Sequence, residues 1–212
     1  MKYLKPINEF WGDVLKRDLL GETREEDKFR SRDELREYLV SEIEKQGDYV
    51  TIQNLDVSMI EDLNYLFDGI GYDVKALNLS GWKTSGAKDM RAMFWGCYSL
   101  ESLDVTGWDT SNVKDMRGVF YKCSALESLD LSGWDTSNVE NMKEMFCNCE
   151  NLESLDASGW DTSNVKDMRG MFYYCINLKS LDLSSWDTSN VKEMDWMFYK
   201  CPALYDNKLV RK

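Results

Sequence analysis

Histidine is absent from this sequence of 212 residues, and no stretch of 18 consecutive apolar residues occurs in it. Histidine is the commonest general base and the commonest transition-metal ligand. We therefore expect no enzyme, no metal centre and no cofactor. A membrane-spanning helix needs about 20 apolar residues, so we expect no membrane insertion. Residues 1–22 contain no unbroken apolar segment followed by a small-residue cleavage site, so no signal peptide is visible and the chain as given is expected to be cytoplasmic.

Basic residues are scarce relative to acidic ones: 26 lysines and arginines stand against 38 aspartates and glutamates, for a net charge of −12. Such a molecule would repel phosphate backbones and anionic membrane surfaces over most of its surface, so we expect no nucleic-acid partner. Apolar residues make up 43 % of the chain, with 13 % aromatic residues. This is enough for a hydrophobic core and argues against a disordered chain.

Three residue types recur with a period of 26 residues, which identifies a tandem repeat. The repeated positions are Trp82, Trp108, Trp134, Trp160 and Trp186; Phe94, Phe120, Phe146, Phe172 and Phe198; and Cys97, Cys123, Cys149, Cys175 and Cys201. Each repeat divides into two halves with different hydrophobic periods, and this division predicts the fold.

The first half of each repeat is predicted to be an α-helix of roughly 12 residues. The apolar positions of one copy fall at offsets of 0, 3, 6, 7 and 10: Val113, Met116, Val119, Phe120 and Cys123. That spacing places them on one helix face. Asp109, Thr110 or Ser111 supplies the N-cap, because a short side-chain oxygen accepts an orphan amide hydrogen bond there. The next copy offers a capping box, Ser137 with Glu140.

The second half predicts a short β-strand. Leu126, Leu129 and Leu131 form the pattern Leu-x-x-Leu-x-Leu, in which the last two leucines point one way and the residues beside them the other. One unit cannot bury its apolar face alone, so the copies must stack. We therefore predict an α/β fold: a right-handed leucine-rich-repeat-type solenoid with a parallel strand ladder, helices on the convex side and strands on the concave side. The handedness follows the parallel crossover rule.

The Leu-x-x-Leu-x-Leu strand, joined to Trp-Asp-Thr-Ser-Asn-Val and Met-Phe-x-x-Cys, resembles the BspA-like leucine-rich repeats of bacterial surface proteins. The similarity covers about residues 74–204. It implies a surface or secreted protein that binds host proteins or mediates adhesion, and it supplies no catalytic residue.

An α-helical cap is predicted before the repeats. Ser31 and Glu34 form a capping box, and an apolar stripe that includes Leu35 and Leu39 ends near Gly47. This helix would cover the first repeat, whose strand is expected at Tyr49–Ile52. We expect a helical N-terminal cap region at 1–48, a leucine-rich-repeat solenoid at 49–206 and a C-terminal tail at 207–212, with a further helix candidate at 1–20.

The outward-facing residues of the predicted strands form parallel stripes, the usual binding side of a solenoid. The candidate ligand-binding residues are Asp104, Asp130, Asp156 and Asp182, flanked by Ser128, Ser154, Glu101, Glu127 and Glu153. Carboxylates stacked about 4.8 Å apart repel by roughly 0.9 kcal/mol per neighbouring pair even in water. Such a stripe is either a surface for a cationic ligand or a divalent ion, or a solvated strand face that prevents edge-on aggregation. The second interpretation is favoured.

The other repeated positions are interpreted as structural. Tryptophans at every strand-to-helix turn are expected in the core rather than in an exposed carbohydrate platform, and the methionines are expected to fill gaps in the core. The cysteines lack zinc-site spacing. They follow helices whose axes should lie about 8–10 Å apart, beyond the roughly 7 Å limit for a disulfide. They are expected to be buried free thiols.

The sequence thus predicts a non-enzymatic binding or adhesion module that recognises a protein or cell-surface ligand through the strand face. The alternative is an acidic cation-binding structural protein, for example a virion or matrix component.

Overall fold

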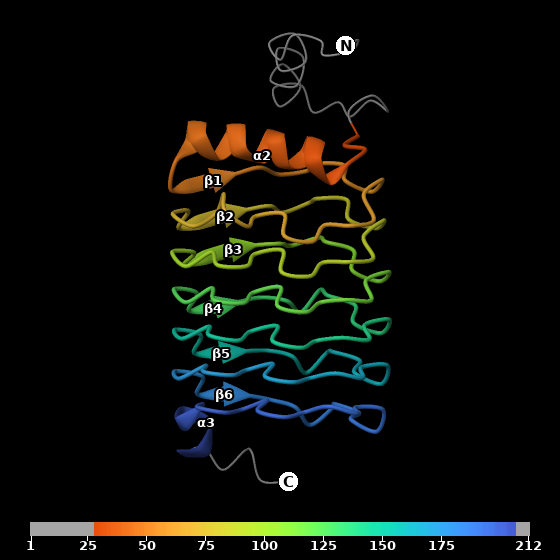
Figure 1. Ribbon diagram of the computed structural model, residues 1–212, viewed down its shortest axis with the longest axis vertical. Coiled ribbons are helices and arrows are strands. Elements are labelled where there is room, and N and C mark those ends of the chain that lie inside the picture. Colours follow the sequence, from red (N-terminus) through yellow and green to blue (C-terminus); the bar gives the residue numbers. More distant parts are fainter. Residues whose placement is uncertain (1–27, 207–212) are drawn as a thin grey trace.

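The computed structural model describes residues 28–206, and its repeats stack in chain order along one long axis (Figure 1). The fold is mixed α/β, with helix α2 (Arg32–Gln46) and helix α3 (Pro202–Asp206) at the two ends of the described chain and six short strands between them. None of the described helices is long and apolar enough to cross a membrane. The helix expected at 1–20 and the tail at 207–212 lie outside the described residues.

The strands form two parallel sheets of three strands each, in the orders β1-β2-β3 and β4-β5-β6. Their bounds are β1 Tyr49–Thr51, β2 Ala76–Asn78, β3 Ser102–Asp104, β4 Ser128–Leu129, β5 Ser154–Leu155 and β6 Ser180–Leu181. The register follows the repeat, since Leu77 pairs with Leu103 and Leu129 with Leu155. These leucines are buried while their neighbours face outward. The parallel ladder and its inward leucines are therefore confirmed, and so is a first strand beginning at Tyr49.

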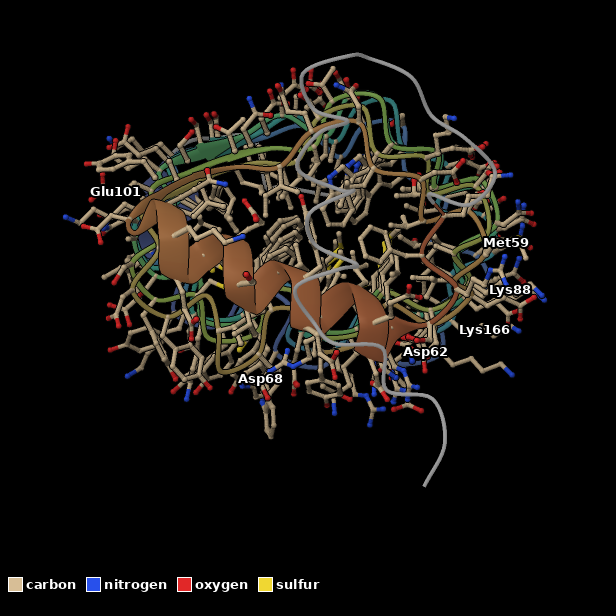
Figure 2. All side chains as sticks on the ribbon, turned by 90° about the horizontal axis from the view of Figure 1, so that it is seen from above. Met59, Asp62, Asp68, Lys88, Glu101 and Lys166 are labelled. Atoms are coloured by element: carbon tan, nitrogen blue, oxygen red, sulfur yellow. The ribbon has the colours of Figure 1, made fainter. Side chains whose placement is uncertain are left out.

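A second hydrogen-bonded ladder runs along the other half of each repeat, where helices were expected. Backbone amides of one repeat donate to carbonyls of the next: Met116 to Asn141 at 2.9 Å, Gly118 to Lys143 at 2.9 Å and Phe120 to Met145 at 2.9 Å. We call the surface of residues 116–122 and their counterparts in the other repeats the turn face. Figure 2 looks down the stack and places Asp62, just before the first such segment, and Asp68, within it, on one long side of the cross-section, with Glu101 at one end.

The prediction of a helix in each repeat is wrong. The apolar side chains from Val113 to Cys123 are buried as expected, but the backbone runs through consecutive turns. Val119 donates to the Met116 carbonyl, and Cys123 to the Phe120 carbonyl. Gly118 has φ 59° and Lys122 φ 61°, and a left-handed residue in every fourth place cannot continue a right-handed helix. Turns of three to four residues give the same apolar spacing as a helix, so the hydrophobic period could not separate the two.

The residues expected to cap those helices stabilise turns instead. The Asp109 carboxylate accepts a hydrogen bond from the Ser111 amide at 3.0 Å, which is an Asx-turn. Thr110 is buried, and its hydroxyl donates to the Asp135 carbonyl of the next repeat at 2.9 Å. Glu140 forms an ion pair with Lys166 rather than a capping box with Ser137. Short polar side chains thus hold neighbouring repeats together.

Helix α2 closes the N-terminal end of the stack, as predicted (Figure 1). The Ser31 side chain accepts a hydrogen bond from the Glu34 amide at 3.2 Å, and Gly47, with φ 75°, ends the helix. Leu35 and Leu39 are fully buried against the repeats. The predicted helix from the Ser31 cap to Gly47 is confirmed.

Arginine side chains of α2 complete this cap in a way the sequence did not predict. Alternate amides of the turn face donate to carbonyls of the following repeat, and the first turn segment has no described repeat before it to supply such donors. Arg36 donates to the carbonyls of Tyr65 at 3.1 Å, Leu66 at 2.5 Å and Asp68. Arg32 donates to the carbonyl of Asn64 at 3.2 Å. Exposed and part-buried carbonyls at this end of the stack thus accept hydrogen bonds from two charged donors.

The repeated aromatic and sulfur-containing residues form the core. Trp82, Trp108, Trp134 and Trp160 are at most 4 % exposed, whereas Trp186 in the last repeat is only partly buried. This confirms the core assignment of the tryptophans. The repeated phenylalanines stack on one another, with ring centroids 5.0–5.7 Å apart. Regular repetition thus turns each side-chain type into a continuous row through the molecule.

All six cysteines are buried and free, as expected, but the reason given for it is wrong. Because adjacent repeats are hydrogen-bonded to each other, they lie about 4.8 Å apart rather than at the spacing of packed helices. The Sγ atoms of Cys123, Cys149 and Cys175 each donate to a phenylalanine carbonyl of the preceding repeat, at 3.1–3.2 Å. These thiols donate hydrogen bonds to backbone carbonyls, and the wide helix spacing expected from the sequence does not separate them.

Candidate functional site

The predicted stripe lies on the strand face, which we define as the outward side chains of β1–β6 and of the residues that directly follow each strand. Its carboxylates are carried by Asp104 at the end of β3 and by Asp130, Asp156 and Asp182, each directly after its strand. The three aspartates after β4, β5 and β6 are exposed, and Asp104 is half-buried. β4, β5 and β6 are paired in register and β3 lies against β4, so the four carboxylates lie in one row.

Each aspartate of the row also stabilises the turn that follows its strand. Asp130 accepts a hydrogen bond from the Ser132 amide at 3.0 Å, and Asp182 accepts one from the Ser184 amide at 2.9 Å. Asp156 accepts from both the amide and the hydroxyl of Ser158, at 3.0 and 2.7 Å. One carboxylate oxygen is therefore used locally, and the remaining oxygen is available for another partner.

These hydrogen bonds favour the ionised form of the three exposed aspartates. The Ser132 hydroxyl and amide lower the pKa of Asp130, and the amide and hydroxyl of Ser184 lower the pKa of Asp182. The pKa of Asp156 is lowered by the hydroxyl and amide of Ser158, and the charges of its two neighbours in the row oppose that shift. Within residues 28–206, no ion pair involves any of the four carboxylates. The row is a line of negative charge held in place by turns.

The flanking residues lie beside the row as expected. Ser128 pairs with Ser154, which pairs with Ser180, and all three are exposed on the strand face. Glu101, Glu127 and Glu153 are exposed just before their strands. Glu153 forms an ion pair with Lys179 at 2.6 Å, so the acidity of this edge is partly neutralised at one end. The structure therefore brings together every residue of the predicted stripe.

A groove on the turn face was not predicted from the sequence. Its volume is about 330 Å³, and its lining includes Tyr121, Cys147, Tyr173 and Trp196. One signal for it is present in the sequence, because Cys147 occupies a position that is aromatic in four of the other repeats, as at Tyr121 and Tyr173. The signal was missed because this half of the repeat was interpreted as a helix.

The fold and these surfaces define a tandem-repeat protein whose parallel, hydrogen-bonded repeats carry regular rows of exposed side chains. The chain matches the family described as "Mycoplasma protein of unknown function, DUF285" twice, over residues 37–128 and 118–210. It belongs to that family. A comparison with curated proteins gave no match.

Proposed function

We propose that this chain is a right-handed, BspA-like leucine-rich-repeat solenoid that acts as a non-enzymatic recognition module. Its strand face binds a protein or cell-surface ligand, and the part of that ligand that meets the aspartate row is cationic. The surface location typical of BspA-like proteins belongs to the same proposal.

The observation that supports the proposal most is the aspartate row itself. Four carboxylates lie in one row, three of them are exposed, and turn hydrogen bonds fix their positions before any ligand arrives. A preorganised row loses little side-chain entropy on binding. Repulsion between neighbouring carboxylates is relieved when lysine or arginine side chains of a partner lie between them.

An array of immobilised cell-surface proteins and glycans, probed with the purified chain, tests this proposal. Asp130→Asn with Asp156→Asn removes two charges and keeps the oxygen that accepts the turn hydrogen bond, so the fold is retained. The matched control is Asp135→Asn with Asp161→Asn, since these aspartates accept the same kind of bond from Ser137 and Ser163 in a different row. Loss of captured ligands in the first variant and not in the control supports the strand face. Equal capture by both variants contradicts it.

The alternative is the acidic cation-binding structural protein, and calcium separates it from the proposal. A divalent-ion site would make millimolar calcium raise the melting temperature, because a ligand of the folded state stabilises that state by mass action. We expect calcium to do no more than sodium chloride of equal ionic strength. A rise of several degrees that disappears in the Asp130→Asn, Asp156→Asn variant would favour the alternative.

A further inference from the structure

An aromatic row crosses the turn face, one position after the buried phenylalanines. Its members are Trp95, Tyr121, Tyr173 and Tyr199. Trp95 and Tyr121 are stacked with ring centroids 3.9 Å apart and an angle of 10° between the ring planes. Tyr173 and Tyr199 are stacked with centroids 5.4 Å apart and an interplanar angle of 23°. Between the two pairs the row is interrupted, because the corresponding residue is Cys147. One ring is missing from an otherwise continuous stack.

A second gap lies beside the first. In the adjacent row, Gly170 comes between Glu144 and Trp196 and contributes no side chain. A Cβ atom built at Gly170 would lie 3.5 Å from Cγ of Glu144 and 3.6 Å from Cβ of Tyr173. The two rows are therefore neighbours, and their gaps merge into the groove of about 330 Å³.

The dimensions of the gap suit one planar ring. Successive repeats are about 4.8 Å apart, so Tyr121 and Tyr173 are separated by two such steps, or roughly 9.6 Å. Aromatic rings stack with centroids about 4.5–7 Å apart. A ring inserted midway would contact both tyrosines and continue the row from Trp95 to Tyr199.

The chemistry of the groove favours an uncharged ring. Cys147 at the floor of the groove is only 5 % exposed, and its sulfur accepts a hydrogen bond from the Asn148 side-chain amide at 3.2 Å. Burial raises the pKa of this thiol to about 12, so the floor carries no charge there. The charged residues at the rim are already paired: Lys143 with Glu144 at 3.5 Å, and Arg169 with Asp167 at 2.6 Å and Glu193 at 2.7 Å. The Asn148 side chain, which also lines the groove, offers a carbonyl oxygen to an indole N–H or a phenol.

Exposed apolar residues next to the groove indicate that the ring belongs to a protein. Trp196 lines the groove and is 72 % exposed, and Tyr199, stacked on Tyr173, is 48 % exposed. They extend the apolar surface beyond the groove, over an area that a single small ring would leave in water. Tryptophan and tyrosine side chains inserted into such pockets are typical anchors of protein interfaces.

We propose that the groove binds a tryptophan or tyrosine side chain of a protein partner, whose ring inserts between Tyr121 and Tyr173. Trp196 and Tyr199 then contact the partner around that anchor. This site lies on the turn face and is independent of the proposed strand-face function.

The test is an NMR titration of the 15N-labelled full chain with the peptide acetyl-Gly-Ser-Gly-Trp-Gly-Ser-Gly-amide. The same peptide with leucine in place of tryptophan is the control ligand, and free indole is a second probe. We expect the tryptophan peptide to cause saturable shifts of the amides of residues 143–148 and 170–173, at millimolar dissociation constants. We expect at least tenfold weaker binding of the leucine peptide.

Two variants of Cys147 make the test specific. Cys147→Tyr supplies the missing ring, as Tyr121 and Tyr173 do in their repeats, and should weaken peptide binding at least tenfold. Cys147→Ser leaves the gap open and should bind as the wild type does. If Cys147→Tyr does not fold, Trp196→Ala replaces it, because this exposed side chain is not needed for packing; it should weaken binding at least threefold.

Three results would overturn the proposal. The first is the absence of saturable shifts with the tryptophan peptide. The second is undiminished binding to folded Cys147→Tyr, or to Trp196→Ala where that variant replaces it. The third is binding of free indole at least tenfold tighter than the peptide, since the groove would then be a site for a small aromatic molecule and not for a protein side chain.

Discussion

The indole N–H groups of the core tryptophans provide a sharp test of how hydrogen bonds and packing share the stability of the stack. Trp108 donates to the Leu79 carbonyl at 2.8 Å. The indole nitrogen of Trp134 is buried in the same way but has no hydrogen-bond partner. Both side chains are 4 % exposed. Their rings stack on each other, with centroids 6.4 Å apart and an angle of 8° between the ring planes. Two nearly equivalent tryptophans therefore differ mainly in one hydrogen bond.

Phenylalanine substitutions convert this difference into a measurable free energy. Trp108→Phe removes the bond and leaves the Leu79 carbonyl short of a donor, whereas Trp134→Phe removes a donor that was unsatisfied. Net hydrogen-bond contributions are about 0.5–1.5 kcal/mol, and an unsatisfied buried acceptor costs about 1–3 kcal/mol. We expect Trp108→Phe to lower the free energy of unfolding by about 1–2 kcal/mol more than Trp134→Phe.

Alanine substitutions at the same positions measure the packing contribution. Each should cost about 3–5 kcal/mol, because a large buried side chain is lost and a cavity remains. Urea unfolding followed by far-UV circular dichroism gives all four values, provided that the dependence on denaturant stays constant among the variants. Equal losses for the two phenylalanine variants would refute the hydrogen-bond reasoning. A Trp134→Ala variant as stable as the wild type would refute the assignment of the tryptophans to the core.

Four further predictions concern the cap, the cysteines, the carboxylates and the turn-face backbone. Arg36→Ala should lower the free energy of unfolding by about 1–3 kcal/mol, because carbonyls of the first repeat lose a charged donor. Arg30→Ala, the control, should have little effect. Equal stability of the two variants would contradict the capping role of Arg36. In a thiol titration with a disulfide reagent, the native protein should react hardly at all and the unfolded protein should show six free thiols; two or fewer would contradict the assignment of free thiols. Burial raises the pKa of Cys97 and of Cys147 to about 12, so the stability that these neutral thiols contribute should be complete below their ordinary pKa of 9.0 and decline as the pH rises toward 12. The pKa values of Asp130 and Asp182 are lowered, so the stability that these carboxylates contribute should be lost as the pH falls below 3.8. Urea unfolding at a series of pH values measures both effects. Lys122→Gly should stabilise the fold by up to about 1 kcal/mol, because Lys122 has φ 61° and a left-handed backbone costs a residue with a Cβ about 1–2 kcal/mol. A melting temperature below that of the wild type would contradict this prediction.

The sequence predicted those parts of the fold whose signals have one interpretation. The 26-residue period, the inward leucines of the strands and the Ser31–Glu34 cap each point to one structure, and each is present. The repeat helices could not be predicted correctly, because the spacing of Val113, Met116 and Phe120 fits a helix and a chain of turns equally well. The glycines at 118 and 170 were the contrary evidence, since both occupy left-handed positions. The aspartate row was found because strand alternation is simple, whereas the groove depends on turn geometry.

Two kinds of surface in this protein follow from the same repetition. Where the repeat is regular, as at Ser128 and Asp130, each copy presents the same group to solvent, and a partner with a matching spacing meets several groups at once. Where the repeat is broken, as at Cys147, the regular neighbours on either side become the walls of a gap. A strict repeat cannot form such a gap, because every position would be filled alike. Exposed rows and interruptions of rows are therefore separate sources of binding sites, and a substitution that restores the repeat, such as Cys147→Tyr, removes the second kind while leaving the first unchanged.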